Sequence, residues 1–214
     1  MNFVEALAGS QQTFGPRIEA VLQQRDLVVT GIGARKTPAD VLTEMSRIAR
    51  EFEKRGARLR SGGAGGADLA FEAGYSDPQC CEIFHPWRRF APKVDGVAVD
   101  VGAVLGRKRP ACGPGAAIVL EGDILRRAEA IAQRFHPAWS RCSDFARKMH
   151  TRNVPQILGP KLDRPCDIVV CWTADGEASG GTGQALRMAK AYDALIVNLK
   201  RPDHLAAIRT ALGL

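Results

Sequence analysis

The sequence lacks features that would assign a function class at once. No apolar run approaches the roughly 18 residues that cross a bilayer, so we expect no membrane-spanning helix. The first ten residues contain Glu5 and no Lys or Arg, so we expect no secretion signal and a cytoplasmic protein. None of the six cysteines forms a CxxC pair. We therefore expect reduced thiols and no metal site.

Two common nucleotide motifs are also missing. No GxxxxGK[ST] segment is present, so a P-loop ATPase is not supported. The dinucleotide pattern GxGxxG matches only halfway, because Gly31-Ile32-Gly33-Ala34-Arg35 is followed by Lys36 instead of a glycine. The next expected strand ends in Ser61-Gly62, where a dinucleotide site has an acidic residue. Ordinary NAD binding is disfavoured, and we expect no cofactor.

What is present is the composition of one globular domain. The chain has 214 residues, of which 45% are hydrophobic and 25% charged, enough to bury one core. Compact apolar runs predict strands at residues 27–32, 57–60, 80–84, 167–172 and 194–199. Amphipathic segments between these runs predict helices. This alternation favours a three-layer α/β domain with a mainly parallel sheet over residues 1–214, with its core at about 27–200.

Two of the expected helices bear on the site. The first begins near Thr37, which we expect to cap it, and continues to Phe52, with Pro38 in its first turn. The second begins at Ser140 and places four side chains along one side. These are Cys142, Phe145, Ala146 and Met149.

The positive charge is concentrated in the middle of the chain. The net charge is +7, and residues 86–152 hold thirteen basic and six acidic side chains. Residues 86–121 also break the strand–helix rhythm with four prolines, and we interpret them as a basic loop insertion. A localised basic region suits a phosphate-bearing partner, although a solubilising surface is an equal alternative.

Glycine-rich loops follow three of the expected strands. They are Gly31-Ile32-Gly33, Gly62-Gly63-Ala64-Gly65-Gly66 and Gly180-Gly181-Thr182-Gly183. Ligands bind at the carboxyl ends of strands in such sheets, and a glycine loop before a helix lets backbone N–H groups approach a phosphate. Tight packing is the alternative for each loop. Three loops at equivalent strand ends favour a shared anionic ligand.

The strings Val29–Arg35, Ser61–Asp68, Arg152-Asn153, Asp167–Trp172 and Ser179–Ala185 together resemble the SLOG superfamily. This group includes the Rossmann-like domain of DNA-processing protein A and the Lonely Guy nucleotide hydrolases. The resemblance implies a Rossmann-like fold that binds a nucleotide or a nucleic-acid phosphate. His136-Pro137-Ala138-Trp139, with Arg152-Asn153 and Cys171-Trp172-Thr173, also resembles small proteins carried by bacteriophages.

The same resemblance assigns site residues to the glycine loops Gly31–Gly33, Gly62–Gly66 and Gly180–Gly183. One half of the crevice would be lined by Gly31, Gly33, Arg35, Ser61, Gly62, Gly63, Gly66 and Asp68. The other half would be lined by Arg152, Gly180, Gly181, Thr182 and Gly183. Arg35 and Arg152 would hold phosphates, and Asp68 would accept hydrogen bonds from a sugar or base. Asp68 also lies in the first turn of a helix, where any protein favours a carboxylate.

Three functions remain open. Binding of a nucleotide or nucleotide-derived signal is our first choice. Single-stranded DNA binding is the alternative, because the basic segment carries Trp87 and Phe90, and Trp139 follows it. Anchoring of loops to the core is the alternative role for both tryptophans. Separately, we expect the protein to form a homodimer.

Nucleotide N-glycosidic hydrolysis is the second alternative. The Lonely Guy motif PGGxGTxxE ends in a carboxylate, and this chain has Arg187 there. Asp175, Glu177 or Glu72 would have to replace that carboxylate, and catalysis stays undecided. No two of His85, His136 and His150 have a metal-ligand spacing of three or four residues.

Overall fold

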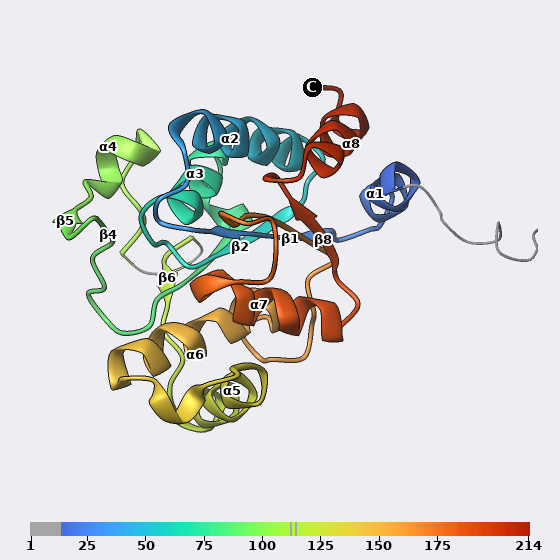
Figure 1. Cartoon of the computed structure of the whole chain (residues 1–214). Coiled ribbons are helices and arrows are strands. Elements are labelled where there is room, and N and C mark those ends of the chain that lie inside the picture. The colour runs from blue at the N-terminus through green and yellow to red at the C-terminus, as the bar shows by residue number, and fades with distance from the viewer. Residues whose placement is uncertain (1–13, 112, 114) are drawn as a thin grey trace, which may run out of the picture.

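The computed structural model describes residues 14–111, 113 and 115–214 (Figure 1). The first ten residues, in which we expect no secretion signal, lie outside the described residues, as does Cys112. In the described ranges, no helix has the length and apolar character to cross a membrane. The cysteines described there are free thiols.

A six-stranded parallel sheet forms the middle layer. Its strands follow the order β6-β3-β2-β1-β7-β8, and every pairing is parallel. The strands are β1 (Val28–Gly33), β2 (Arg58–Ser61), β3 (Cys81–Phe84), β6 (Ala117–Ile118), β7 (Ile168–Trp172) and β8 (Leu195–Asn198). All residues of β7 are buried, as expected for an inner parallel strand covered on both faces.

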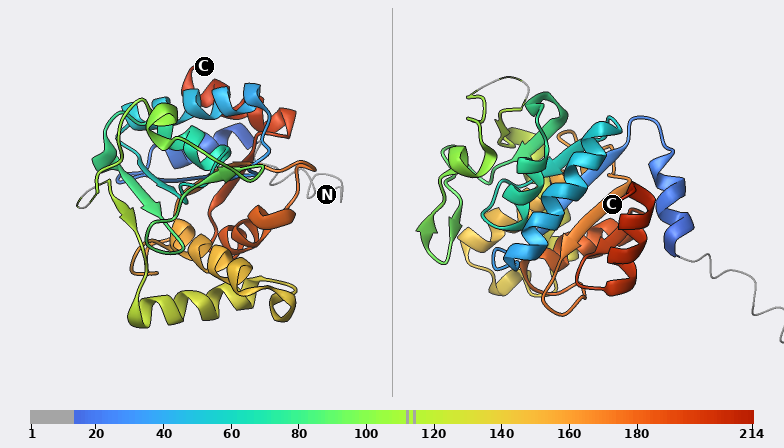
Figure 2. Two further views of the ribbon diagram at one scale, coloured as in Figure 1. Left: turned by 90° about the vertical axis from the view of Figure 1, so that its left-hand side faces the viewer. Right: turned by 90° about the horizontal axis from the view of Figure 1, so that it is seen from above.

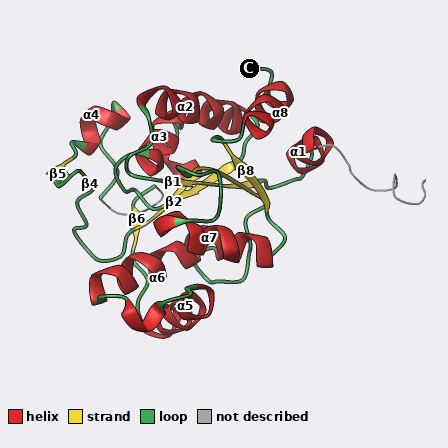
Figure 3. Ribbon diagram, in the orientation of Figure 1, coloured by secondary structure: helices red, strands yellow, loops and turns green. Residues whose placement is uncertain are grey.

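Helices cover both faces of this sheet (Figures 1 and 3). One face carries α1 (Phe14–Leu22), α2 (Ala39–Lys54), α3 (Ala67–Gly74) and α8 (Pro202–Leu212). The other carries α5 (Gly122–Phe135), α6 (Asp144–Leu158) and α7 (Gly180–Ala191). The two faces bury separate apolar clusters, because alternate residues of each strand point to opposite sides. In β1, Val29 enters one cluster while Val28 and Ile32 enter the other. The predicted three-layer Rossmann-like α/β architecture is confirmed.

Two predicted helix starts are wrong. Pro38, not Thr37, is the N-cap of α2, and the Thr37 hydroxyl donates to the Ala34 carbonyl at 2.8 Å. The helix predicted from Ser140 begins at Asp144, with Ser143 as its N-cap, because residues 139–141 form a separate 3₁₀ turn. A hydroxyl near a helix start marks the region of the cap better than the cap itself.

The segment 86–121 is more than a loop. It contains a short hairpin of β4 (Lys93–Val94) and β5 (Val97–Ala98), then α4 (Val101–Leu105), all beside α3 (Figure 2). Its last part forms β6, which pairs with β3 and so belongs to the sheet. A two-residue strand has too short an apolar pattern to be recognised from sequence.

One arginine of this segment is structural. Arg109 Nε donates to Glu72 of α3 at 2.8 Å, and the Glu72 side chain is only 1% exposed. Arg109 also lies 3.2 Å from the His85 ring nitrogen Nε2. This buried contact fixes part of the basic segment to the core.

The order of the strands defines where a ligand can bind. From β1 the chain builds outward through β2, β3 and β6, and β7 and β8 then join on the opposite side of β1. The loops after β1 and β7 therefore leave the sheet in opposite directions. In open parallel sheets, the crevice at this reversal point is where ligands bind.

Candidate functional site

A cleft of 710 Å³ opens at this reversal point. Its walls come from the loop after β1, the start of α3, the tip of the β4–β5 hairpin, one side of α6, and the loop between β7 and α7. From the predicted site it contains Gly33, Arg35, Asp68, Arg152, Gly180, Gly181 and Thr182. It also contains His150, Asn153 and Gln156 of α6, which we did not assign to the site from sequence.

The N-terminus of α7 opens on this cleft without a side-chain cap. The N-cap residue is Ser179, but its hydroxyl donates to Asp175 Oδ1 at 2.8 Å and caps no helical N–H group. The first turn of α7 contains no acidic residue. A helix start of this kind carries a positive partial charge and N–H groups that accept an anion.

The glycines at this helix start leave open space. A Cβ built on Gly180 or Gly181 meets no atom within 4 Å. Gly180 also has a φ of +59°, which favours glycine, whereas Gly181 has an ordinary φ. Gly183 is different, since it is buried and a Cβ would meet the Ala178 carbonyl. Only the first two glycines therefore keep the cleft clear.

The loop 61–66 contains no comparable space. A Cβ on Gly62 would meet the Arg152 guanidinium, and one on Gly63 would come within 2.9 Å of His85 Nε2. Gly66 has a φ of +84°, and its Cβ would come within 2.6 Å of the Arg35 carbonyl oxygen. Groups of the protein itself fill the space beside each of these glycines.

Two further predicted ligand residues are also buried by packing. The Ser61 hydroxyl donates to the Gly31 carbonyl at 2.8 Å, and Ser61 is fully buried. A Cβ on Gly31 would collide with the ring of Phe71. Neither residue lines the cleft.

A buried ion pair lies at the floor of the cleft. Arg152 Nη1 donates to the Gly62 carbonyl at 2.7 Å and lies 3.3 Å from Asp68 Oδ2. The same Asp68 oxygen accepts from Ala64 N–H at 3.2 Å. Burial raises the pKa of Asp68, opposed by the charge of Arg152, and burial lowers the pKa of Arg152, opposed by Asp68. Arg152 therefore joins α6 to the loop 61–66.

Two buried nitrogen atoms beside this pair have no hydrogen-bond partner. They are Arg152 Nε and Gln156 Nε2, and both residues line the cleft. Buried donors of this kind are almost always satisfied in native proteins. Other atoms of the protein cover both nitrogens, so they lie beneath the surface of the cleft.

The exposed positive charges that line the cleft lie on the loop after β1. Arg35 and Lys36 are exposed, and Lys36 Nζ lies 3.3 Å from Asp95 at the hairpin tip. An exposed ion pair of this kind contributes little stability. Both cations are therefore available to a negatively charged ligand.

The first turns of α6 give the cleft an apolar patch. The predicted stripe Phe145, Ala146 and Met149 lines the cleft, and Cys142 lies outside the helix. Phe145 is 58% exposed, and its ring lies 5.6 Å from that of Trp87. Trp139 packs elsewhere, against His136.

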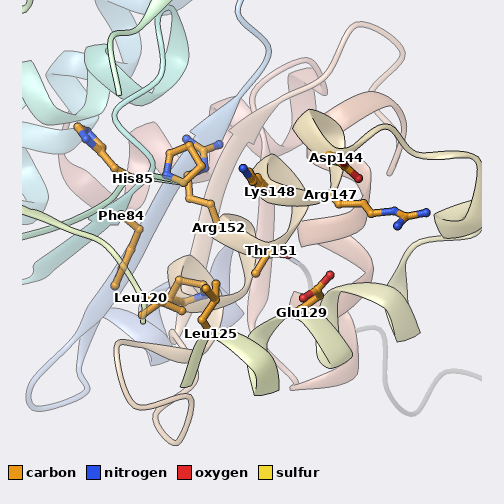
Figure 4. A pocket seen from close by; sticks show the side chains of 12 residues that line it. Phe84, His85, Leu120, Leu125, Glu129, Asp144, Arg147, Lys148, Thr151 and Arg152 are labelled. Carbon is orange, nitrogen blue, oxygen red and sulfur yellow. The ribbon is translucent and has the colours of Figure 1, made fainter. Parts of the chain in front are cut away.

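A smaller cavity of 280 Å³ shares Arg152 with the cleft (Figure 4). It lies between the end of β3 and the helices α5 and α6. Its wall combines Lys148 and Arg147 with the carboxylates of Glu129 and Asp144. The mixed charge makes it a poorer anion site than the start of α7.

The carboxylates considered for hydrolysis lie away from the cleft. Glu72 is paired with Arg109, and Asp175 accepts from Glu177 N–H and from the Ser179 hydroxyl. Neither they nor Glu177 line the cleft, where the carboxylates are Asp68 and Asp95. Arg187 donates to the carbonyls of Phe135 and Ala178.

Three potential metal ligands come together on the α5–α6 side, although we expected no metal site from sequence. The ligand atoms of His136, Cys142 and His150 all lie within 4.8 Å of one another. They are contributed by the end of α5, the turn before α6, and α6 itself. Spacings of six and eight residues match no common metal motif.

The fold and the cleft define the class of protein: a Rossmann-like α/β domain with a cleft at its strand reversal. No protein-family model matches the chain, and no curated protein does. Among solved structures it is similar to DNA processing protein A from Helicobacter pylori, described for its single-stranded DNA binding mode. The identity is 18% over 84% of this chain and 67% of that one, with a TM-score of 0.48. SLOG membership and bacteriophage origin stay predictions.

Proposed function

We propose that this protein binds a nucleotide or nucleotide-derived ligand in the 710 Å³ cleft, with a phosphate at the N-terminus of α7. The observation that carries the proposal is the uncapped start of α7, with open space at Gly180 and Gly181. Exposed Arg35 supplies a second phosphate contact from the opposite wall. The α7 start is a ready-made anion site only because no side chain of the protein fills it.

The rest of the ligand would follow the walls of the cleft. A base would lie against the apolar side of α6, where Phe145 and Met149 are. Arg152 and Asp68 would hold the floor in place beneath the ligand. In this arrangement Arg152 acts mainly as a positioning residue.

The substitution Gly181→Val tests the proposal. A valine there has room to fold but projects into the space of the phosphate. Gly15→Val is the matched control, because Gly15 is also the second residue of a helix with nothing within 4 Å of its Cβ. Calorimetry against nucleoside mono-, di- and triphosphates, ADP-ribose and cyclic dinucleotides should find a ligand for the wild type and for Gly15→Val. Gly181→Val should bind it at least about 10-fold more weakly, a loss of one favourable anion contact.

If Gly181→Val and Gly15→Val bind the ligand with equal affinity, the phosphate does not bind at the start of α7. Chromatography of each mixture adds a second readout. Free base in the wild-type mixture would show that the protein hydrolyses the N-glycosidic bond and does not only bind the nucleotide.

Single-stranded DNA is the second candidate, favoured by the exposed ring of Phe145 beside Trp87. Arg88, Arg89 and Lys148 lie near these rings in the sequence and supply positive charge. Bases stack on such aromatic rings, and DNA affinity falls steeply with salt. A steep salt dependence, with a several-fold loss in Phe145→Ala, would favour DNA over a mononucleotide.

A further inference from the structure

We propose that His136, Cys142 and His150 form a binding site for a divalent transition metal of zinc type. The three side chains are all half-buried, and their ligand atoms lie within 4.8 Å of one another. This proposal does not depend on which ligand occupies the cleft.

The distances are close to those that zinc requires. Zn–S and Zn–N bonds of about 2.3 Å and 2.1 Å at a tetrahedral angle separate sulfur and nitrogen by about 3.6 Å. Cys142 Sγ lies 3.6 Å from His136 Nδ1 and 3.8 Å from Nε2. The two imidazole rings have centroids 4.3 Å apart. A bound ion would draw the three ligand atoms, which lie within 4.8 Å of one another, to tetrahedral distances.

The local hydrogen bonding supports a metal more than a purely structural cluster. His150 Nδ1 is buried and has no hydrogen-bond partner. His136 Nδ1 has two long contacts, with Ala138 N–H at 3.2 Å and with Cys142 Sγ at 3.6 Å. A metal would use a nitrogen lone pair from each ring and the thiolate of Cys142. Thiolate and imidazole are the ligands that zinc prefers over magnesium or calcium.

The cluster lies near cations, so the thiolate of Cys142 would have to offset part of the charge of a bound divalent ion. Arg187 is the nearby cation that acts on both histidines, and its guanidinium is held by the carbonyls of Phe135 and Ala178. Arg152 is a second cation that acts on His150. The thiolate halves the charge of the bound ion.

The cluster also leaves room for a fourth ligand. His150 lines the cleft, whereas His136 and Cys142 lie behind it. Three protein ligands with one free position are typical of zinc sites that bind water or a substrate group. The open position of this site would face the cleft.

Cobalt spectroscopy on the untagged, chelator-treated full chain tests the site. Co²⁺ should bind with one ion per chain and give a thiolate-to-cobalt charge-transfer band, and Zn²⁺ should displace it. Cys142→Ser should abolish the band. His150→Gln should weaken Co²⁺ binding by more than about 10-fold, the loss that even an outer-shell change produces. Cys80→Ser is the matched control, because Cys80 is also half-buried and lies outside the cluster. It should bind like the wild type.

Absence of stoichiometric binding in the wild type would overturn the proposal. A charge-transfer band that persists in Cys142→Ser, or disappears in Cys80→Ser, would also overturn it. Circular dichroism of each metal-free variant checks that it is folded. Nucleotide titrations of the metal-free wild type separate this result from the function of the cleft.

Discussion

The two glycine-rich loops that flank the cleft look alike in sequence and differ in structure. In the loop 61–66, Arg152, His85 and the backbone of Arg35 fill the places where side chains would be. The start of α3 behind this loop is already occupied: Ala67 N–H donates to Ala34, and Asp68 lies in the first turn. In the loop 176–183, Gly180 and Gly181 face open space and α7 has no cap.

The difference separates two reasons for a glycine. The glycines of the first loop allow close packing within the protein. Gly180 and Gly181 of the second loop leave space that no protein atom occupies. The carboxylate of Asp68 takes the place at α3 that we propose an external phosphate takes at α7. The first turn of α3 contains a carboxylate, which is favourable at the positive end of a helix, and the first turn of α7 contains none.

The largest difference in stability between the two loops should appear when a methyl group is added to each. Gly66→Ala combines a φ of +84° with a collision against the Arg35 carbonyl. We expect it to lower the free energy of unfolding by about 3 kcal/mol or more. Gly181→Ala should change it by less than about 0.5 kcal/mol. Urea denaturation measures the free energy of unfolding of both variants. Similar losses in the two variants would contradict the difference between the loops.

Removal of the cation that holds the first loop should have the next largest effect. Arg152→Met leaves Asp68 buried without its partner, which typically lowers stability by about 3 kcal/mol. Asp68→Asn in the same background should restore part of the loss. Since burial already raises the pKa of Asp68, the penalty in Arg152→Met should be smaller at pH 5 than at pH 7. Strictly additive effects of the two substitutions would contradict the pairing.

The histidine that packs on Gly63 should make the first loop pH-sensitive. Burial, with the charge of Arg109, lowers the pKa of His85 from 6.5 to about 4. The neutral form is favoured in the folded state, so its stabilising contribution is complete above pH 6.5 and is lost as the pH falls towards 4. Between pH 7 and pH 5 the loss should be about 2 kcal/mol.

His85→Gln tests this, because a glutamine oxygen can still accept from Arg109 without titrating. Unfolding of both proteins is measured at pH 7 and pH 5. Parallel decreases in the two proteins would assign the pH sensitivity to other groups.

The smallest stability effect should come from making the second loop resemble the first. Thr182→Asp puts a carboxylate in the first turn of α7, where none is present. It should stabilise the protein by about 0.5 kcal/mol through the helix dipole. It should also weaken nucleotide binding, because the carboxylate occupies the anion site. A more stable variant with unchanged affinity would place the ligand elsewhere.

The sheet could be predicted from sequence because its signals are local. Apolar runs at 27–32 and 167–172 correspond to β1 and β7, and the apolar stripe after Pro38 corresponds to the buried side of α2. Proximity of the loops after β1 and β7 followed from the general behaviour of parallel sheets. The order of the strands could not be predicted from the sequence, because β6 is too short to show an apolar pattern.

The site was only partly predictable, because what decides it is space between distant segments. Nothing in a glycine-rich string shows that Gly62 meets Arg152 of α6, ninety residues later, while Gly181 meets nothing. The same applies to His136 and His150, which are joined through an irregular turn and not by a regular spacing. Periodicity describes one element at a time, whereas a cleft is defined between elements.

The pairing of β1 with β7 also has a consequence for how the chain acquires its structure. Val29 of β1 pairs with Ile168 of β7, so the central pairing of the sheet joins segments that lie far apart in the sequence. During synthesis, β1, β2 and β3 emerge well before β7, and one edge of β1 stays without its neighbour for most of translation. The half of the cleft on α3 can form early, whereas the half on α7 must wait for β7. The complete cleft can therefore form only after α7 has left the ribosome.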